Sequence, residues 1–222
     1  MSDESLFREV DEEVRQDQIK KIWQRHGGLI STAALIIVIA VAAFQGWKYW
    51  QLRQSEASAQ TYADGIALIS DGKAPEGEAL LQTITHSGYS TLAKLRRAAA
   101  LNAEGKTDDA VAAYDAVAAD PNTDPALQDL AKIRAGYILA DKVTPAELIK
   151  RLGTFDKEDS RWRSAAREIF ALSAYRTADY SMADRYLNAI IADREAPGSL
   201  RQRAQMLAQL VAPLLPEKST TQ

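Results

Sequence analysis

The pattern of apolar and polar residues divides the chain into one long uncharged run and a series of shorter amphipathic segments. Residues 27–47 contain no charged side chain in 21 positions. A helix of this length rises about 30 Å, the thickness of a bilayer's hydrocarbon core, and satisfies its own backbone hydrogen bonds there. The alternative is a buried helix of a soluble core, but such helices seldom run so long without a charge. The pattern therefore predicts a transmembrane helix, placed at residues 27–50.

The residues that flank this run predict how it is anchored and oriented. Aromatic rings with a polar edge favour the headgroup region, and long basic side chains reach toward it. The expected anchor consists of Trp47, Lys48, Tyr49 and Trp50. Five basic residues precede the run and two follow it closely, and positive charge is retained on the cytoplasmic side. We therefore expect a cytoplasmic tail at residues 1–26 and an exported domain at residues 54–215.

A cleaved signal peptide is an alternative to an anchor, because Ala57-Ser58-Ala59 fits the pattern that signal peptidase reads. The apolar run exceeds the ~7–15 residues of a signal sequence core, however, and seven acidic residues precede it. We expect the run to stay attached. Within it, Ala42 and Gly46 are four residues apart, a spacing that lets another helix approach closely. The high alanine content of the run is the simpler explanation of that spacing.

The tail has a discontinuous apolar stripe over residues 6–25, which predicts a helix. Such a helix could contact a cytoplasmic partner, or it could be a short surface helix leading into the span. We favour the second interpretation, because the seven acidic residues make the tail a poor binder of anionic lipid.

After residue 53 the chain is rich in alanine and lacks the strict alternation typical of strands. Glycine, proline and capping residues occur at intervals that suit short helices. The fold class expected is all-α, with a single transmembrane helix followed by an α-solenoid of about nine helices. The expected helices are 54–71, 75–86, 90–104, 107–119, 125–141, 144–152, 160–177, 181–193 and 197–214. Residues 216–222 are expected to be a disordered tail.

Two helical pairs in this region repeat one another. Ala98 and Ala171 are 73 residues apart, and so are Ala110 and Ala183, which is about two units of the 34-residue tetratricopeptide repeat. These alanines mark the places where paired helices are expected to touch. The packing residues expected beside them are Tyr114 in one pair and Tyr186 or Leu187 in the other. Degenerate copies are expected around Ala135 and Leu148, and around Ala67 and Ala79.

Composition narrows the function further. The chain has no cysteine and a net charge of −3, so disulfides, thiolate chemistry and cysteine-based metal sites are excluded, and nucleic acid is not an expected partner. Its two histidines, His26 and His86, have no second ligand or nucleophile at a useful spacing. Acidic residues are scattered over the helices, as on a solvated surface. We therefore expect no catalytic site, cofactor or metal.

The chain as a whole resembles the YfgM-like ancillary subunits of the bacterial Sec translocon. The resemblance rests on a short charged tail, a span that ends in Gly46-Trp47-Lys48-Tyr49-Trp50, and a tetratricopeptide-like domain. It implies a single-pass inner-membrane protein with a periplasmic domain and no catalysis. The partners that it implies are translocon subunits, a membrane-anchored periplasmic chaperone and exported polypeptides, together with the lipid bilayer.

Two functions are compatible with these features. In the first, the helix pairs form a concave surface that captures a protein segment beside the export site. In the second, the domain is a structural scaffold that joins envelope complexes without binding clients. Because the first helix of each pair lines the concave side, the expected contact residues are Leu95, Ala99, Asn102, Glu168, Leu172, Tyr175 and Arg176. The alternative for Leu95 and Leu172 is an ordinary place in the core.

Overall fold

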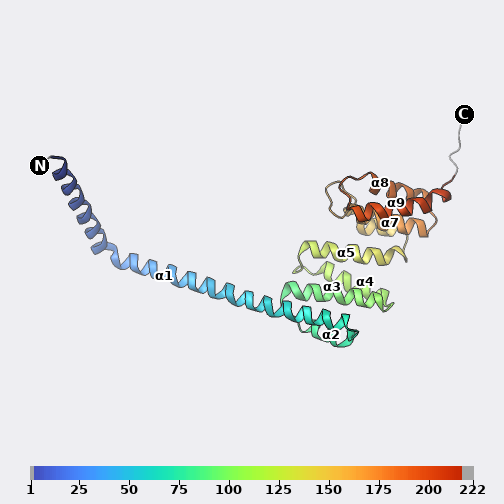
Figure 1. Ribbon diagram of the computed structural model, residues 1–222, viewed down its shortest axis with the longest axis horizontal. Helices are drawn as coiled ribbons and strands as arrows, with labels where there is room; N and C mark the ends of the chain where they lie inside the picture. The colour runs from blue at the N-terminus through green and yellow to red at the C-terminus, as the bar shows by residue number, and fades with distance from the viewer. Residues whose placement is uncertain (1–2, 217–222) are drawn as a thin grey trace. The chain divides into compact units, whose positions relative to one another are not determined.

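A computed structural model describes residues 3–216, and all regular secondary structure in that range is helical (Figure 1). This confirms the all-α class. The nine α-helices and two 3-10 helices of the described range are α1 (Asp3–Ser70), α2 (Ala74–Gln82), α3 (Ser87–Ala103), α4 (Thr107–Ala119), α5 (Pro125–Ala140), α6 (Pro145–Leu152), η1 (Gly153–Phe155), α7 (Arg163–Arg176), α8 (Tyr180–Ala192), α9 (Gly198–Val211) and η2 (Ala212–Leu214). The tail predicted at residues 216–222 lies, after Pro216, outside the described residues.

The chain consists of two structural units, Met1–Ala57 and Ser58–Gln222. In the first unit, the helices expected over the tail and the span form one continuous helix, and α1 then runs on into the second unit. The physical reason is local, because residues 51–57 contain neither proline nor glycine and nothing else that would end a helix. The separate helix expected from residue 54 is therefore the last part of α1.

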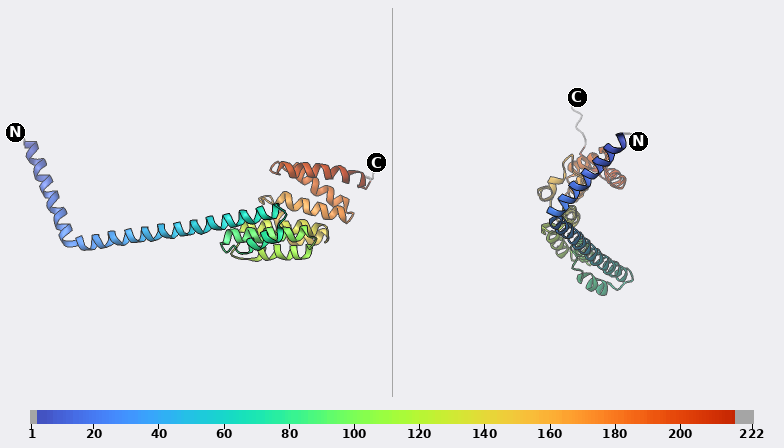
Figure 2. Two further views of the ribbon diagram at one scale, coloured as in Figure 1. Left: turned by 60° about the horizontal axis from the view of Figure 1, so that its bottom comes forward. Right: turned by 90° about the vertical axis from the view of Figure 1, so that its left-hand side faces the viewer.

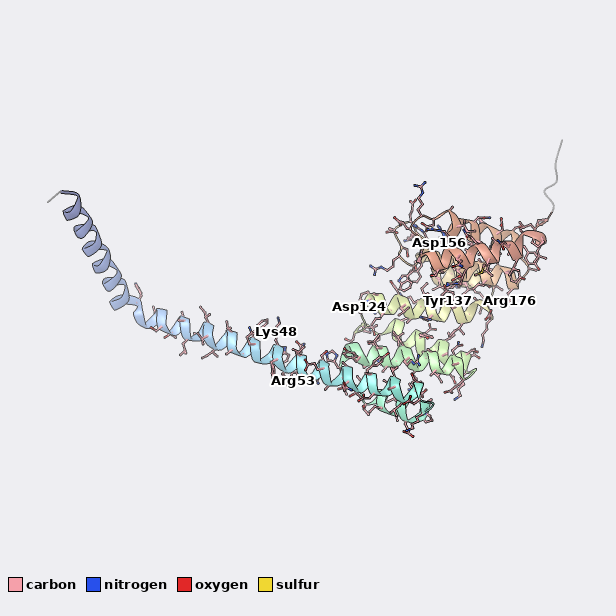
Figure 3. All side chains as sticks on the ribbon, viewed as in Figure 1. Lys48, Arg53, Asp124, Tyr137, Asp156 and Arg176 are labelled. Atoms are coloured by element: carbon pink, nitrogen blue, oxygen red, sulfur yellow. The ribbon has the colours of Figure 1, made fainter. Side chains whose placement is uncertain are left out.

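One helix of the described range is long and apolar enough to cross a membrane, and the apolar 18-residue window that meets this criterion lies within Ser31–Ser70 and is not buried. The anchor residues Trp47, Tyr49 and Trp50 have exposed side chains, and the rings of the two tryptophans lie 5.7 Å apart. Arg53, which is labelled in Figure 3, donates through Nε to the Tyr49 hydroxyl at 2.9 Å. Lys48 lies 5.5 Å from the centre of the Phe44 ring, so its ammonium group has an aromatic partner.

The second unit is a series of helical hairpins, in each of which the two helices approach at one buried residue from each side. The two members of every pair are twelve positions apart in the sequence. The pairs are Gly65 and Gly77, Ala98 and Ala110, Gly136 and Leu148, and Ala171 and Ala183. Small side chains at most of these places allow the backbones to come close together.

The second half of each hairpin repeats a further pattern. Large apolar side chains lie four and seven residues after the contact residue of the second helix. They belong to that helix or to the turn that follows it, and each is at most 8% exposed. They are Leu81 and Ile84, Tyr114 and Val117, Leu152 and Phe155, and Leu187 and Ile190. Successive hairpins are offset by 33, 38 and 35 residues, close to the 34 of a tetratricopeptide repeat. The predicted solenoid is thus confirmed.

The register predicted for the two degenerate copies is wrong in part. Ala67 and Ala79 are exposed, and the contact in that hairpin is made by Gly65 and Gly77. In the middle copy, Gly136 and not Ala135 faces the second helix, because a Cβ built on it would lie 2.5 Å from Leu152 Cδ1. Alanine alone does not mark these contacts, because glycine allows a still closer approach.

Helix α9 follows the fourth hairpin and packs against α8. Ala204 and Val211 are buried in the cluster that they share with α7 and α8. Another side of α9 is polar and exposed, with glutamines at residues 202, 205 and 209. A polar side on the outermost helix helps to keep the end of a solenoid soluble.

The segment between α6 and α7 is held in place by two arginines of α7. Arg163 donates to the carbonyl oxygen of Glu158, and Arg167 is paired with Asp156 at 2.6 Å. Arg163 is also paired at 2.7 Å with Asp193, which follows α8. Burial alone would raise the pKa of Asp193. The hydrogen bonds from Arg163 and from the Glu195 backbone, together with the positive charges of Arg163 and Arg167, outweigh burial and hold that pKa below its usual value. These pairs fix the start of α7 and with it Trp162, which precedes the helix.

Candidate protein-binding surface

The first helices of the last hairpins, α5 and α7, lie side by side, and α7 also lies beside α9 (Figure 2). Together the three helices line an open hollow with a volume of about 790 Å³. We call this surface the hollow. Its apolar lining comes from all three helices and from the residue before α7, and it includes Leu130, Trp162, Leu172, Leu200, Met206 and Leu207. An apolar hollow of this size can hold several side chains of a bound segment.

A polar network lies among these apolar side chains. Glu168 of α7 is 2% exposed, and Arg203 of α9 binds its carboxylate through Nε at 2.8 Å and Nη2 at 2.9 Å. The Tyr137 hydroxyl of α5 donates to the same carboxylate at 2.5 Å. Two-point binding by a guanidinium is strong and directional. The network therefore ties the three helices of the hollow together.

The protonation of this network follows from its surroundings. Burial and the hydrogen bond to Glu168 raise the pKa of the Tyr137 hydroxyl above its usual value. The hydrogen bonds to Glu168 likewise raise the pKa of the Arg203 guanidinium. Near neutral pH, Tyr137 is thus a neutral donor and Arg203 is a cation.

Some polar capacity in the hollow is unused. The indole N–H of Trp162 is buried and has no hydrogen-bond acceptor among the described residues. Arg134 of α5 is exposed at the hollow and has no ion pair within the described range. A ligand that brings an oxygen acceptor would satisfy either donor.

Exposed apolar side chains extend along α9 from the hollow. Met206 lines it and is 53% exposed, and Leu210, four residues later on α9, is 58% exposed. Leu214, in the following η2, is 41% exposed. Exposed apolar residues grouped in this way mark interaction surfaces more often than single ones do.

Of the residues expected on the concave side of α7, Glu168 and Leu172 do line the hollow. Glu168 is not free to bind a ligand, however, because it is buried beneath Arg203 and Tyr137, and that part of the prediction is wrong. Leu172 is half-buried against the neighbouring core cluster. One part of the Leu172 side chain therefore packs in the core, as the alternative expects, and another part lines the hollow.

Tyr175 and Arg176 lie at the far end of α7 and are not part of the hollow's lining. The Tyr175 ring is 40% exposed and stands 5.9 Å from the ring of Tyr180. Arg176 donates to the carbonyl oxygens of Ala140 and Val143. These bonds satisfy carbonyls at the end of α5, so the guanidinium has a structural role.

The residues expected on α3 are Leu95, Ala99 and Asn102. Leu95 is half-buried and packs against the cluster of Ala98 and Tyr114, as the core alternative holds. Ala99 is half-buried and Asn102 is exposed. None of the three lines the hollow.

The span positions Ala42 and Gly46 are both exposed, and a Cβ built on Gly46 would meet nothing within 4 Å. Their role in contact with another helix stays a prediction.

Sequence reasoning missed Tyr137, Arg203 and Met206. The repeat pattern predicts no repeat beyond α8, so it points to no site residue on α9. The spacing of Met206 and Leu210 is the available signal, because it places two large apolar residues on one side of a helix.

The comparisons with known proteins agree with this architecture. A family model described as a tetratricopeptide repeat-like domain matches residues 20–170. The chain is also similar to the ancillary SecYEG translocon subunit of Haemophilus influenzae (strain ATCC 51907 / DSM 11121 / KW20 / Rd), with 30% identity over 95 residues. That alignment covers 40% of this chain and 45% of the relative, so the chain spans less than half of the relative's length. No solved structure matches the chain.

Proposed function

The chain belongs to the tetratricopeptide repeat-like domain family, and on that premise we propose that it is a membrane-tethered protein-binding module of the cell envelope. The observation that carries this proposal is the hollow of α5, α7 and α9, with its exposed Met206 and its unused donors. Its chemistry suits a polypeptide, which offers apolar side chains and carbonyl oxygens together. The module is non-catalytic.

A place beside a Sec-type translocon is the second part of the proposal. It is supported by the similarity to the ancillary SecYEG translocon subunit and by the apolar segment of α1. A tether to the membrane raises the effective concentration of the hollow near an emerging polypeptide. The partners are then translocon subunits, exported polypeptides and a membrane-anchored periplasmic chaperone.

This role requires the repeat domain to lie on the exported side of the inner membrane. We expect a reporter that is active only in the periplasm to be active when fused after Leu215, and one active only in the cytoplasm to be silent there. The basis is the excess of basic residues before the span. Fusions at residue 2 should give the opposite pattern, and a cytoplasmic signal from the fusion after Leu215 would refute this orientation.

The test of binding is crosslinking in living cells. A photoreactive residue at Met206 should capture translocon subunits and exported polypeptides, because this side chain lines the hollow and is exposed. The matched position is Asn188, which is exposed on α8, the second helix of its hairpin. If Met206 and Asn188 give the same crosslinked proteins in equal amounts, the hollow is not the binding surface.

The set of proteins crosslinked to Met206 also distinguishes client binding from scaffolding. A client-binding module gives many exported chains in small amounts. A scaffold gives a single stoichiometric partner, and that outcome would favour the structural alternative.

A further inference from the structure

The charged residues of the repeat domain are distributed unequally between two sets of helices, which are the first helices of the last three hairpins together with α9, and the second helices of the four hairpins. The helices α3, α5, α7 and α9 together carry ten basic residues and two acidic ones. The helices α2, α4, α6 and α8 carry three basic residues and seven acidic ones. The net charge of −3 for the whole chain conceals this difference. The helices that line the hollow belong to the basic set.

Some of the basic residues are engaged in ion pairs or hydrogen bonds within the domain. Arg163 and Arg167 are ion-paired with loop carboxylates, while Arg176 and Arg201 donate to backbone carbonyls. These four stabilise loops and helix ends, so they add little to the potential that a ligand meets.

Others remain at the surface without an ion pair within the described range. Arg134 lies at the hollow, and Arg96 and Arg97 are exposed on α3. Arg96 stands two residues before Ala98, as Arg134 stands two residues before Gly136. The repeat register therefore places Arg96 and Arg134 on the same side of their helices.

We infer that the hollow recognises an acidic amphipathic polypeptide segment, whose apolar side chains enter it while its carboxylates meet Arg134 and the outer side of Arg203 there and Arg96 beyond the hollow on α3. This inference rests on the proposed protein-binding function and names the chemistry of the partner. Carboxylates are bound by guanidinium groups in a planar, directional way. Such complementarity raises the association rate and suppresses partners of the wrong charge.

A polypeptide fits these features better than other polyanions do. Besides Arg134, the hollow is lined by Leu130, Leu172 and Met206. A phosphate backbone would give these apolar side chains no apolar contact. A bilayer surface is too flat to fill a hollow of about 790 Å³. The buried indole N–H of Trp162 further calls for a single acceptor, such as a backbone carbonyl.

The experiment uses the full chain in detergent micelles and three fluorescent peptides that share one leucine spacing. Between the leucines they carry glutamate, glutamine or lysine. We expect the glutamate peptide to bind about tenfold more tightly than the glutamine peptide, and the lysine peptide to bind weakest. The preference should shrink as salt shortens the screening length from about 10 Å at 0.1 M toward about 3 Å at 1 M.

The variant that tests the residues is Arg96→Glu with Arg134→Glu, which should weaken the glutamate peptide about tenfold or more and strengthen the lysine peptide. Its matched control is Lys150→Glu with Arg185→Glu, which makes the same charge change on exposed positions of α6 and α8. The control should leave the affinity within about twofold, because charges outside the binding face act only at long range.

The possible results separate this inference from the proposed function. Equal affinity for the three peptides, or equal losses in the two double variants, would overturn the preference for acidic segments. The same holds if single-stranded DNA or vesicles of anionic lipid compete as well as the glutamate peptide. If Met206→Asp abolishes the binding of all three peptides, the hollow remains the binding surface. If no peptide binds and Met206 yields no crosslink, the proposed function itself fails.

Discussion

Replacing Gly77 by alanine is expected to destabilise the first hairpin by about 2 kcal/mol or more, although the change adds a single methyl group. A Cβ built at this position would lie 2.5 Å from the carbonyl oxygen of Gly65 and 2.7 Å from Ile69 Cγ1. The first of these atoms belongs to the backbone of α1, so it cannot move aside as a flexible side chain would. The two helices must therefore separate, which also loosens the packing of Leu81.

The loss is expected despite an opposing gain, because alanine favours a helix over glycine by roughly 1 kcal/mol. Gly88→Ala is the matched control. Gly88 is also helical, but the nearest atom to a Cβ there is His86 Nδ1, 3.9 Å away. This control should be neutral or stabilising by up to about 1 kcal/mol. Thermal unfolding of the full chain in micelles, followed by circular dichroism, distinguishes the two, and equal melting temperatures would refute the close contact.

The helices were predictable because their ends carry local signals. Proline follows the cap at the start of α5 and of α6, and Thr144 and Glu147 form a capping box at α6. Such signals depend on a few neighbouring residues and survive any tertiary arrangement. The continuity of α1 was missed for the same reason, since no local signal marks an end between the span and the first repeat.

The repeat register was predictable only where alanine marks the contact. Ala98, Ala110, Ala171 and Ala183 are at most 2% exposed, as expected. In the other two hairpins glycine takes the first position, and glycine also occurs in turns such as Gly72 and Gly105, where φ is positive. A single sequence does not separate these two uses of glycine, because the difference lies in what the neighbouring helix does.

The candidate site was less predictable, because it depends on contacts between distant parts of the chain. Glu168 and Arg203 are 35 residues apart, and Glu168 and Tyr137 are 31 apart. The place of Glu168 in the repeat assigns it to the exposed concave side. Glu168 is buried because Arg203 packs over it from α9, a helix that the repeat pattern does not include.

This arrangement predicts an asymmetric response to substitution. Arg203→Ala should lower the free energy of unfolding by about 2 kcal/mol, because it leaves the buried Glu168 carboxylate with Tyr137 as its remaining bonded partner of the network. The loss should be smaller than the ~3–5 kcal/mol typical of a fully buried pair, since the Arg203 side chain is 48% exposed and keeps part of its hydration.

Adding Glu168→Gln to Arg203→Ala should then recover part of that stability. A neutral amide costs far less to bury than an unpaired carboxylate, and it can still accept the hydrogen bond from Tyr137. Urea unfolding of the two variants and the parent chain measures the effect. Arg97→Ala, which removes an exposed arginine of α3 that has no ion pair within the described range, is the control and should change stability by less than about 0.5 kcal/mol. If the double variant is less stable than Arg203→Ala alone, the cost does not come from an unpaired buried charge, and Arg203 acts through packing against Met206 and its neighbours in the hollow.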